Sequence, residues 1–228
     1  MKPMRPQSRG DDRWLAKQWP LAAIAAVLVV IASWLAWRHF SIGDVRNLGS
    51  RGSNVIAFGD SLTAGYGAQA GEDYPSRVAA STGIAIINAG VSGDTTESAL
   101  ARLDNDVVSR DPRIVIVGLG GNDYLQSIPI ATTETNLRSI IDKIEAAGAA
   151  VILLGFRLPS LNADYEAMYE RVAKDERCLF VSNVLRGILT SPELKSDEVH
   201  PNARGYQLMA DRIAGPLQKL VRAANAKR

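Results

Sequence analysis

Residues 55–67, VIAFGDSLTAGYG, join a run of apolar residues to a glycine-rich turn. Four consecutive apolar residues at 55–58 are typical of a short strand that is buried on both faces. Ser61 then lies where such a strand turns into a helix, and the N–H groups at the start of a helix favour negative charge. Serine is also a common helix cap, so this stretch alone leaves Ser61 as either a cap or a reactive group.

The same alternation of apolar runs and amphipathic stretches continues through the rest of the chain. Alternating strands and helices predict an α/β fold in which helices cover both faces of a parallel sheet. Ligands of such sheets bind beyond the carboxyl ends of the strands. The expected strands are 55–58, 84–87, 114–117, 151–154 and 179–181, and the expected helices are 74–81, 95–108, 133–147, 164–174 and 204–221.

Glycine-rich segments follow the second and third predicted strands. Gly93 lies in NAGVSGDTT at 88–96, where it can offer an unobstructed backbone N–H. Asn122 lies in GGND at 120–123, where glycines let the backbone approach a ligand and the asparagine presents an amide donor. Taken singly, each segment is typical of an ordinary turn.

A third polar segment, DEVHPNARG at 197–205, lies near the C-terminus. Its spacing places Asp197 within local reach of the imidazole of His200, and such a carboxylate fixes the tautomer of a histidine that acts as a base. Together with Ser61, the segments supply a nucleophile, a base, an orienting acid and oxyanion donors. This set of groups indicates a hydrolase.

The cysteine, histidine and charge counts narrow the chemistry further. Cys178 is the only cysteine, and His39 and His200 are the only histidines among 228 residues. A disulfide within the chain is impossible, and a zinc site, which usually takes three or four Cys and His ligands, is not expected. His39 directly follows an apolar segment, so His200 is the candidate proton shuttle. Residues 41–228 carry 20 basic and 22 acidic side chains, which offers nucleic acid no basic surface.

These segments together resemble the SGNH subgroup of the GDSL esterase/lipase family, and they are most similar to its bacterial thioesterase, lysophospholipase and arylesterase branch. The resemblance implies Ser61 as the nucleophile, His200 as the base and Asp197 as its partner. It also implies an oxyanion hole formed by the backbone N–H groups of Ser61 and Gly93 and the side chain of Asn122. The implied fold is a flavodoxin-like, three-layer α/β/α arrangement around a five-stranded parallel sheet.

The loops after the third and fourth predicted strands carry candidate substrate-binding residues, Tyr124, Leu125 and Leu158. Together with Ile128, Ile130 and Leu161, they lie where a parallel sheet places the walls of its pocket, and most of these side chains are apolar. We therefore expect an acyl chain to bind there, although such side chains also commonly fill the core beneath loops.

The N-terminal region predicts a membrane anchor. Residues 18–37 are twenty consecutive residues without a charge, enough for a helix of about 30 Å that spans a bilayer. Five basic residues precede this segment, so the positive-inside rule places the N-terminus in the cytoplasm. Tryptophans border it, as expected for rings that prefer the headgroup layer; they are Trp14, Trp19, Trp34 and Trp37.

The expected organisation is a cytoplasmic tail at 1–17, a transmembrane anchor at 18–37, a flexible linker at 38–53 and an SGNH hydrolase domain at 54–228. The linker is expected because residues 41–53 are rich in glycine and serine and lack periodicity. A buried core helix is the alternative for the apolar segment. The anchor places the domain on the extracytoplasmic side of the inner membrane.

We therefore expect a membrane-anchored serine ester hydrolase that forms a covalent acyl-enzyme without a metal or cofactor. Its substrates would be carboxylic esters or thioesters, such as lysophospholipids, acyl thioesters or aryl esters. A carbohydrate O-acetyl esterase of the cell envelope would use the same residues with a more polar pocket. A tethered binding module without turnover is a third reading, which the intact Ser61, Asp197 and His200 disfavour.

Overall fold

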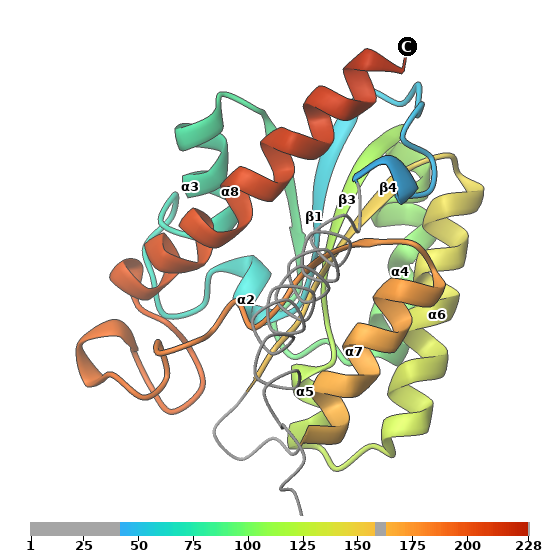
Figure 1. Cartoon of the computed structure of the whole chain (residues 1–228). Helices are drawn as coiled ribbons and strands as arrows, with labels where there is room; N and C mark the ends of the chain where they lie inside the picture. The colour runs from blue at the N-terminus through green and yellow to red at the C-terminus, as the bar shows by residue number, and fades with distance from the viewer. Residues whose placement is uncertain (1–41, 158–162, 228) are drawn as a thin grey trace, which may run out of the picture. The chain divides into compact units, whose positions relative to one another are not determined.

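The computed structural model describes residues 42–157 and 163–227, which form a sheet between two layers of helices (Figure 1). The sheet has five parallel strands in the order β2-β1-β3-β4-β5. This is the flavodoxin-like order, so the predicted α/β fold and five-stranded parallel sheet are confirmed. The predicted anchor at 18–37 lies outside the described residues. Within the two described ranges, no helix is both long and apolar enough to cross a membrane.

The central strands are almost completely buried, whereas the two edge strands, β2 and β5, keep partly exposed residues. All five expected strands are short apolar runs, which predicts burial on both faces. This prediction is wrong for the two edge strands, each of which has a neighbouring strand on one side only. β2 also begins two residues later than expected and continues to Gly90, because Asn88 and Ala89 pair with β1. The strands are β1 (Asn54–Gly59), β2 (Ile86–Gly90), β3 (Pro112–Gly118), β4 (Ala150–Leu154) and β5 (Leu179–Val181).

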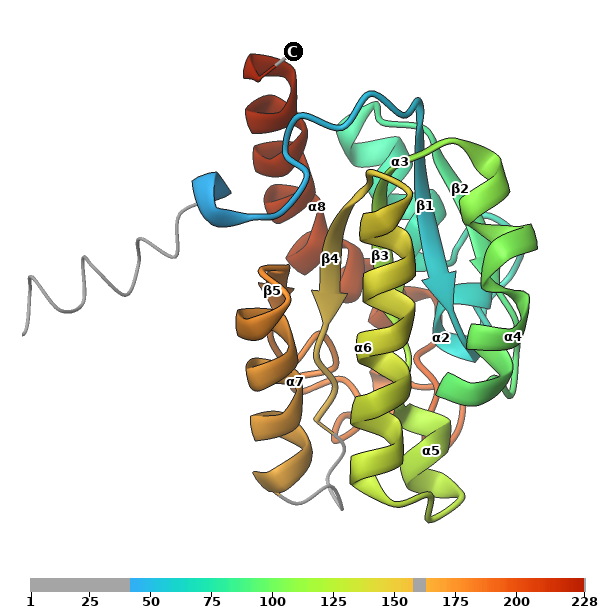
Figure 2. The ribbon, with the colours of Figure 1, turned by 90° about the vertical axis from the view of Figure 1, so that its right-hand side faces the viewer.

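Helices α3 and α8 cover one face of the sheet, and α4, α6 and α7 cover the other (Figures 1 and 2). The last helix continues through Pro216 and is longer than expected, because its apolar residues remain buried as far as Ala224. The helices are α2 (Ser61–Ala64), α3 (Tyr74–Thr82), α4 (Thr96–Asp106), α5 (Gly121–Leu125), α6 (Ile130–Ala146), α7 (Ala163–Asp175) and α8 (Ala203–Ala226), with 3-10 helices η1 (Ile42–Asp44), η2 (Val108–Arg110) and η3 (Pro192–Leu194).

Residues 42–53, predicted as part of a flexible linker, are instead packed against the domain. Val45 and Leu48 are each 3% exposed and belong to the hydrophobic core. The side chain of Asn47 donates a hydrogen bond to the backbone oxygen of Glu145 at 2.7 Å. Two apolar residues three positions apart thus dock this segment despite its glycine-rich and serine-rich composition. The compact domain begins at residue 42 and not at 54.

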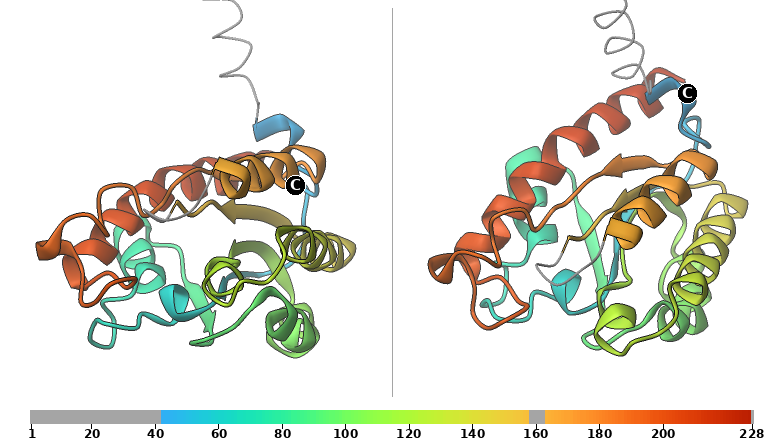
Figure 3. Two further views of the ribbon diagram at one scale, coloured as in Figure 1. Left: turned by 90° about the horizontal axis from the view of Figure 1, so that it is seen from below. Right: turned by 60° about the horizontal axis from the view of Figure 1, so that its bottom comes forward.

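The segments that follow the strands gather at one end of the sheet, at the bottom of Figures 1 and 2. Figure 3 looks onto this end and shows the short helices α2 and α5 beside the long segment that joins β5 to α8. The C-terminal end of α8 lies at the opposite end of the sheet. The fold therefore brings together the three polar regions that the sequence singled out, as expected for the carboxyl ends of parallel strands.

Candidate active site

Ser61 is the first residue of α2 and follows the central strand β1 after a single residue, Asp60. The side chain of Asp60 caps this one-turn helix by accepting a hydrogen bond from the N–H of Leu62 at 3.0 Å. Asp60, and not Ser61, is therefore the helix cap, which leaves the Ser61 hydroxyl free of that role. Ser61 is 9% exposed at the carboxyl end of the sheet.

A continuous row of hydrogen bonds joins Ser61, His200 and Asp197. His200 Nε2 lies 3.0 Å from Ser61 Oγ, and His200 Nδ1 lies 2.8 Å from Asp197 Oδ2. Burial raises the pKa of Asp197, but hydrogen bonds from the Val199 N–H and from His200 lower it by more, so the net pKa is below its usual value. Asp197 is thus a carboxylate that accepts a hydrogen bond from Nδ1–H of His200, which leaves Nε2 as the acceptor that faces Ser61.

The loop that carries Asp197 and His200 is fixed at its ends. The Ser196 N–H donates to the His200 oxygen at 2.9 Å, and the Asn202 side chain caps α8 immediately after the loop. A β-carbon at Gly67 would overlap the hydroxyl of Ser196, so only glycine lets the turn after α2 approach this loop. These contacts hold the imidazole beside the serine.

Tyr66 lies against His200, with 4.5 Å between the ring centroids and 47° between the ring planes. Its side chain is 55% exposed, and its backbone oxygen accepts a hydrogen bond from the hydroxyl of Tyr206 at 2.8 Å. Helix α8 therefore holds the backbone of a residue whose ring covers the imidazole. Sequence reasoning assigned Tyr66 no role. Its position five residues after Ser61, in the same turn, could have identified it as a residue of this site.

Gly93 and Asn122 come together from the segments that follow β2 and β3. Gly93 has a φ of +88°, a left-handed conformation that favours glycine. The adjacent Asp94 accepts a hydrogen bond on its backbone oxygen from Asn122 Nδ2 at 2.8 Å. This bond ties the start of α5 to the loop that carries Gly93, so both predicted oxyanion donors lie at the carboxyl end of the sheet.

Arg102 of α4 connects this loop to the ends of β1 and β2. Its Nε donates to Asp94 Oδ2 at 2.6 Å, and its terminal nitrogens donate to the backbone oxygens of Gly59 and Ala89 at 3.0 Å each. One half-buried guanidinium thus fixes the loop of Gly93 relative to the strand that precedes α2. Arg102 also pairs with Asp106, one turn further along α4, at 2.7 Å. Sequence reasoning missed its contacts at the strand ends, because no local pattern identifies the two backbone oxygens or the Asp94 carboxylate as its partners.

Asp123, the last residue of GGND, is fully buried and joins three helices. It accepts hydrogen bonds from the N–H of Thr96 at 2.9 Å and from the hydroxyl of Thr133 at 3.3 Å. Since Asp123 follows Asn122 in α5, these bonds to α4 and α6 fix the direction in which Asn122 points. Asp123 is therefore a positioning residue that sequence reasoning left without a role.

Asp60 is a second buried carboxyl group at this end, with 2% exposure. Burial raises its pKa to about 7, the N–H of Leu62 lowers it, and the charges of Asp94 and Asp123 raise it. Asp60 therefore gains and loses a proton near neutral pH, which is unusual for an aspartate.

The predicted substrate-binding residues lie in different environments. Tyr124 is half-buried and packs edge-on against Tyr165, with 5.4 Å between the ring centroids. Leu125, the last residue of α5, is 51% exposed. Leu158 lies outside the described residues. Tyr124 thus contributes to the core beneath the loop, Leu125 faces solvent three residues after Asn122, and their role in substrate binding stays a prediction.

A cavity of about 470 Å³ opens at the carboxyl ends of β4 and β5. Neither Ser61 nor His200 lines it, so it is separate from the hydrogen-bonded row described above. Its lining is mainly polar and includes three arginines; the residues are Arg157, Glu166, Phe180, Val181, Ser182, Asn183, Arg186, Arg212 and Pro216.

Comparison with known proteins identifies the family of this chain. Residues 57–208 match the model of the GDSL-like lipase/acylhydrolase family. The chain is 33% identical over 175 residues to the Escherichia coli thioesterase 1/protease 1/lysophospholipase, a match that covers 73% of this chain and 84% of that enzyme. It is 30% identical to an arylesterase of Vibrio mimicus, with coverage of 72% and 88%.

Solved structures show the same fold. The psychrotrophic esterase EstA from Pseudoalteromonas has a TM-score of 0.67 at 27% identity, and the match covers 74% of this chain and 98% of EstA. AlinE4, an SGNH-hydrolase family esterase, is 37% identical with a TM-score of 0.59 and coverage of 75% and 98%. The predicted family resemblance is confirmed. The chain therefore belongs to the GDSL-like lipase/acylhydrolase family and is a carboxylic ester hydrolase.

Proposed function

We propose that the protein cleaves carboxylic esters or thioesters through an acyl-enzyme, with Ser61 as nucleophile, His200 as general base and Asp197 as the group that orients the imidazole. The row of hydrogen bonds from Ser61 Oγ through His200 to Asp197 carries this proposal. His200 takes the serine proton as Oγ attacks the acyl carbonyl, and returns it to the leaving alcohol or thiol. A water molecule activated by the same imidazole then releases the acid.

The negative charge that develops on the carbonyl oxygen requires hydrogen-bond donors. The proposed donors are the backbone N–H groups of Ser61 and Gly93 and the side-chain amide of Asn122. Nδ2 of Asn122 carries two hydrogens; one binds the Asp94 oxygen, which leaves the other for the oxyanion.

Exposed apolar side chains support an apolar acyl group as the substrate. In the described part of the chain, the large hydrophobic residues with strong exposure are Tyr66, Val91 and Leu125, at 55%, 43% and 51%. Each lies within five residues of one proposed oxyanion donor. Exposed apolar groups gathered on functional loops are typical of a binding surface for an apolar ligand.

We therefore propose a preference for medium acyl chains over acetate. Each methylene buried against such a surface contributes about 0.8 kcal/mol, so several of them favour the longer chain by one or more orders of magnitude.

A carbohydrate O-acetyl esterase is the second candidate. The observation that favours it is similarity to an acetylxylan esterase of Geobacillus stearothermophilus, which is 25% identical over 152 residues. This activity would use the same three residues, so only the acyl and alcohol groups of the substrate separate the two candidates.

Two measurements test these proposals. The first is labelling with a fluorophosphonate probe, which should modify the wild-type protein and not Ser61→Ala; an unlabelled wild type would contradict a reactive serine and favour a binding module.

The second is kcat/KM for acetyl, butyryl, hexanoyl and octanoyl esters of one alcohol. We expect a rise of about tenfold or more from acetyl to hexanoyl, reduced in Leu125→Ala. A steady fall from acetyl onward would favour the O-acetyl esterase.

We also propose that residues 18–37 anchor the protein in the inner membrane, with the hydrolase domain on the extracytoplasmic side. The support comes from the uncharged segment, the basic residues before it and the tryptophans at its borders. The protein should remain in the membrane during carbonate extraction. A soluble product that begins near residue 38 would contradict the anchor, and it would show no tryptophan emission because all four tryptophans precede that point.

A further inference from the structure

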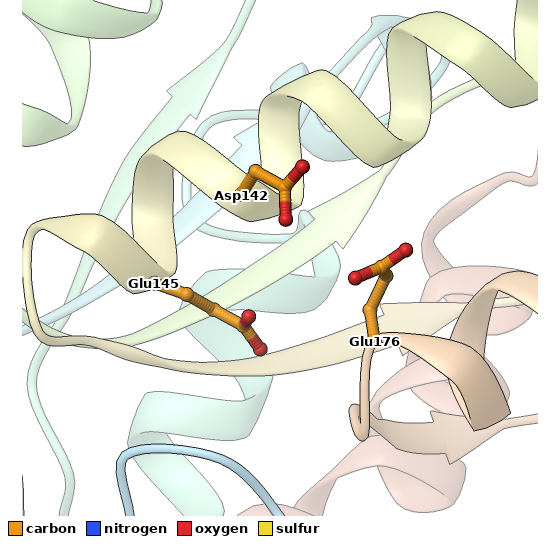
Figure 4. Close-up of side chains that lie close together, drawn as sticks. All are labelled: Asp142, Glu145 and Glu176. Carbon is orange, nitrogen blue, oxygen red and sulfur yellow. The ribbon is translucent and has the colours of Figure 1, made fainter.

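Three carboxylates meet at the end of the sheet opposite Ser61. Asp142 and Glu145 lie near the C-terminal end of α6, and Glu176 lies in the turn between α7 and β5. One oxygen of each carboxylate lies within 4.8 Å of the corresponding oxygens of the other two. Figure 4 shows the three side chains directed toward a common space between α6 and this turn.

Glu145 supplies an independent observation, because one of its oxygens lacks a partner. Its side chain is only 3% exposed, and Oε2 pairs with the guanidinium of Arg46 at 2.6 Å. Oε1 is buried and accepts no hydrogen bond from the residues that the structure describes. A buried carboxylate oxygen without a donor or cation destabilises the folded state, because it loses its hydrogen bonds to water and forms no others in their place.

The other two carboxylates also retain free acceptor capacity. Glu176 Oε1 accepts a hydrogen bond from Arg138 at 2.6 Å, which leaves its second oxygen for another ligand. Asp142 is exposed, so the space between the carboxylates is reached from solvent. The three carboxylates face one another across this space, and a cation placed between them would relieve their mutual repulsion.

We propose that Asp142, Glu145 and Glu176 form a structural binding site for Ca²⁺. Calcium takes oxygen ligands at 2.3–2.6 Å, so ligands on opposite sides of the ion lie about 5 Å apart, which agrees with the spacing of these carboxylates. Magnesium requires shorter distances and near-ideal octahedral geometry, and zinc prefers nitrogen and sulfur ligands. Water molecules complete the coordination.

The bound ion would join the end of α6 to the turn before β5, beside the docked segment that contains Arg46. Its effect is therefore on the stability of this end of the domain. Because Ser61 lies at the other end of the sheet, the ion has no part in ester hydrolysis, and the site is independent of the proposed function.

The test uses the full-length chain after treatment with a chelator, at constant ionic strength. Calorimetric titration with CaCl₂ should give one saturable site with a Kd of about 0.1–1 mM, the range of weak extracellular calcium modules. The melting temperature should rise by about 2–5 °C at 10 mM Ca²⁺. Asp142→Asn, a change at an exposed position, should lose the binding heat and most of this rise.

Glu170→Gln is the matched control, because it removes one exposed carboxylate from α7 outside the cluster and should leave the response intact. Absence of a saturable response up to 10 mM Ca²⁺ would overturn the proposal. An equal response in Asp142→Asn would also overturn it, because calcium would then bind elsewhere. An equal rise with Mg²⁺ at the same concentration would contradict the assignment to calcium.

Discussion

Two arginine–carboxylate pairs at opposite ends of the sheet have the same length and different surroundings. Arg102 and Asp94 at the carboxyl end, and Arg46 and Glu145 at the amino end, each approach to 2.6 Å. Both oxygens of Asp94 are bonded, one to Arg102 and the other to the hydroxyl of Ser98. One oxygen of Glu145 has no hydrogen-bond partner within residues 42–157 and 163–227. The distance within an arginine–carboxylate pair therefore does not identify the function of the pair. The second carboxylate oxygen distinguishes the two pairs, because it is bonded in Asp94 and not in Glu145.

The Arg102–Asp94 pair, in which both carboxylate oxygens are bonded, holds a loop of the proposed active site in place. The Arg46–Glu145 pair, which leaves one carboxylate oxygen available, is suited to binding a further ligand. Arg102 also donates to two strand-end carbonyl oxygens, so the Asp94 loop has little freedom to move. The comparison predicts that substitutions at the carboxyl end change turnover, whereas substitutions at the amino end change stability and leave turnover unchanged. Four substitutions test this division.

Ser61→Ala should produce the largest effect, a loss of about 10³-fold or more in kcat with an unchanged fold. Removing one member of a catalytic triad leaves only the contributions of oxyanion donors and substrate binding. The measurement is steady-state hydrolysis of an aryl ester, with circular dichroism as the check on folding. Ser109→Ala, at an exposed serine of η2, should retain wild-type turnover. Near-normal turnover in Ser61→Ala would refute the mechanism.

Asp60→Asn tests whether the carboxyl end also affects stability. The folded-state pKa of Asp60, about 7, lies above the ordinary value of 3.8, so the folded state holds a proton that the unfolded state releases. This contribution is fully present below about pH 4 and is lost as the pH rises through 7. Between pH 5 and pH 8, the wild type should lose roughly 3 kcal/mol from this group.

Asparagine keeps the oxygen that caps α2 and carries no charge, so Asp60→Asn should lack this loss in urea unfolding at the two pH values. Asp197 does not interfere, because its pKa is lowered and its contribution changes only at more acidic pH. Burial also raises the pKa of Glu145 to about 7, but Glu145 is present in both proteins, so the difference between them isolates Asp60. An equal pH dependence in both proteins would show that Asp60 is already ionised at pH 5.

Leu48→Ala tests the amino end, where residues 42–53 are docked. Truncating this buried side chain should lower the free energy of unfolding by about 2–3 kcal/mol, because it removes apolar contacts and leaves a cavity. Turnover at low temperature should remain unchanged. Arg51→Ala, at an exposed position of the same segment, should have little effect on stability. Equal stability of the two variants would indicate a linker that is not docked.

Arg102→Lys should give the smallest effect, a reduction of kcat by about 10-fold to 100-fold with little change in KM. Lysine keeps the charge but cannot bond the Asp94 carboxylate and two backbone oxygens at the same time. The Gly93 N–H therefore remains available to the oxyanion but is held less firmly in position. Arg110→Lys, at a more exposed arginine that also contacts Asp106, is the matched control. A rise in KM with unchanged kcat would assign Arg102 to substrate binding instead.

Local patterns predicted the parts of the molecule that depend on neighbouring residues. The central strand was predictable because 55–58 are all apolar, and the pairing of Asp197 with His200 because they are three residues apart. The meeting of these two residues with Ser61 required the family resemblance, since spacing carries no information across so long a separation. The structure supports that expectation.

Contacts between distant segments could not be predicted in the same way. Val45 and Leu48 are two apolar residues in a segment whose glycine and serine content indicates flexibility. Their burial in the hydrophobic core depends on distant residues, so it could be recognised only from the structure. The carboxylate cluster joins α6 to the turn after α7, so Asp142 and Glu176 belong to stretches that each resemble a solvated helix face. Arg102 is similar, because the Asp94 carboxylate and the two strand-end oxygens that it binds all lie outside its own helix.

Ser61 and His200 are separated by 139 residues, and the loop that holds His200 is fixed by the last helix of the domain. Domains generally fold as units, and contacts between distant residues form late. A nascent chain that ends before residue 197 contains Ser61, the proposed nucleophile, but neither His200, the proposed base, nor Asp197, the proposed orienting acid. On the proposed mechanism, ester hydrolysis therefore begins only late in the biosynthesis of the domain, and a chain truncated before residue 197 is inactive.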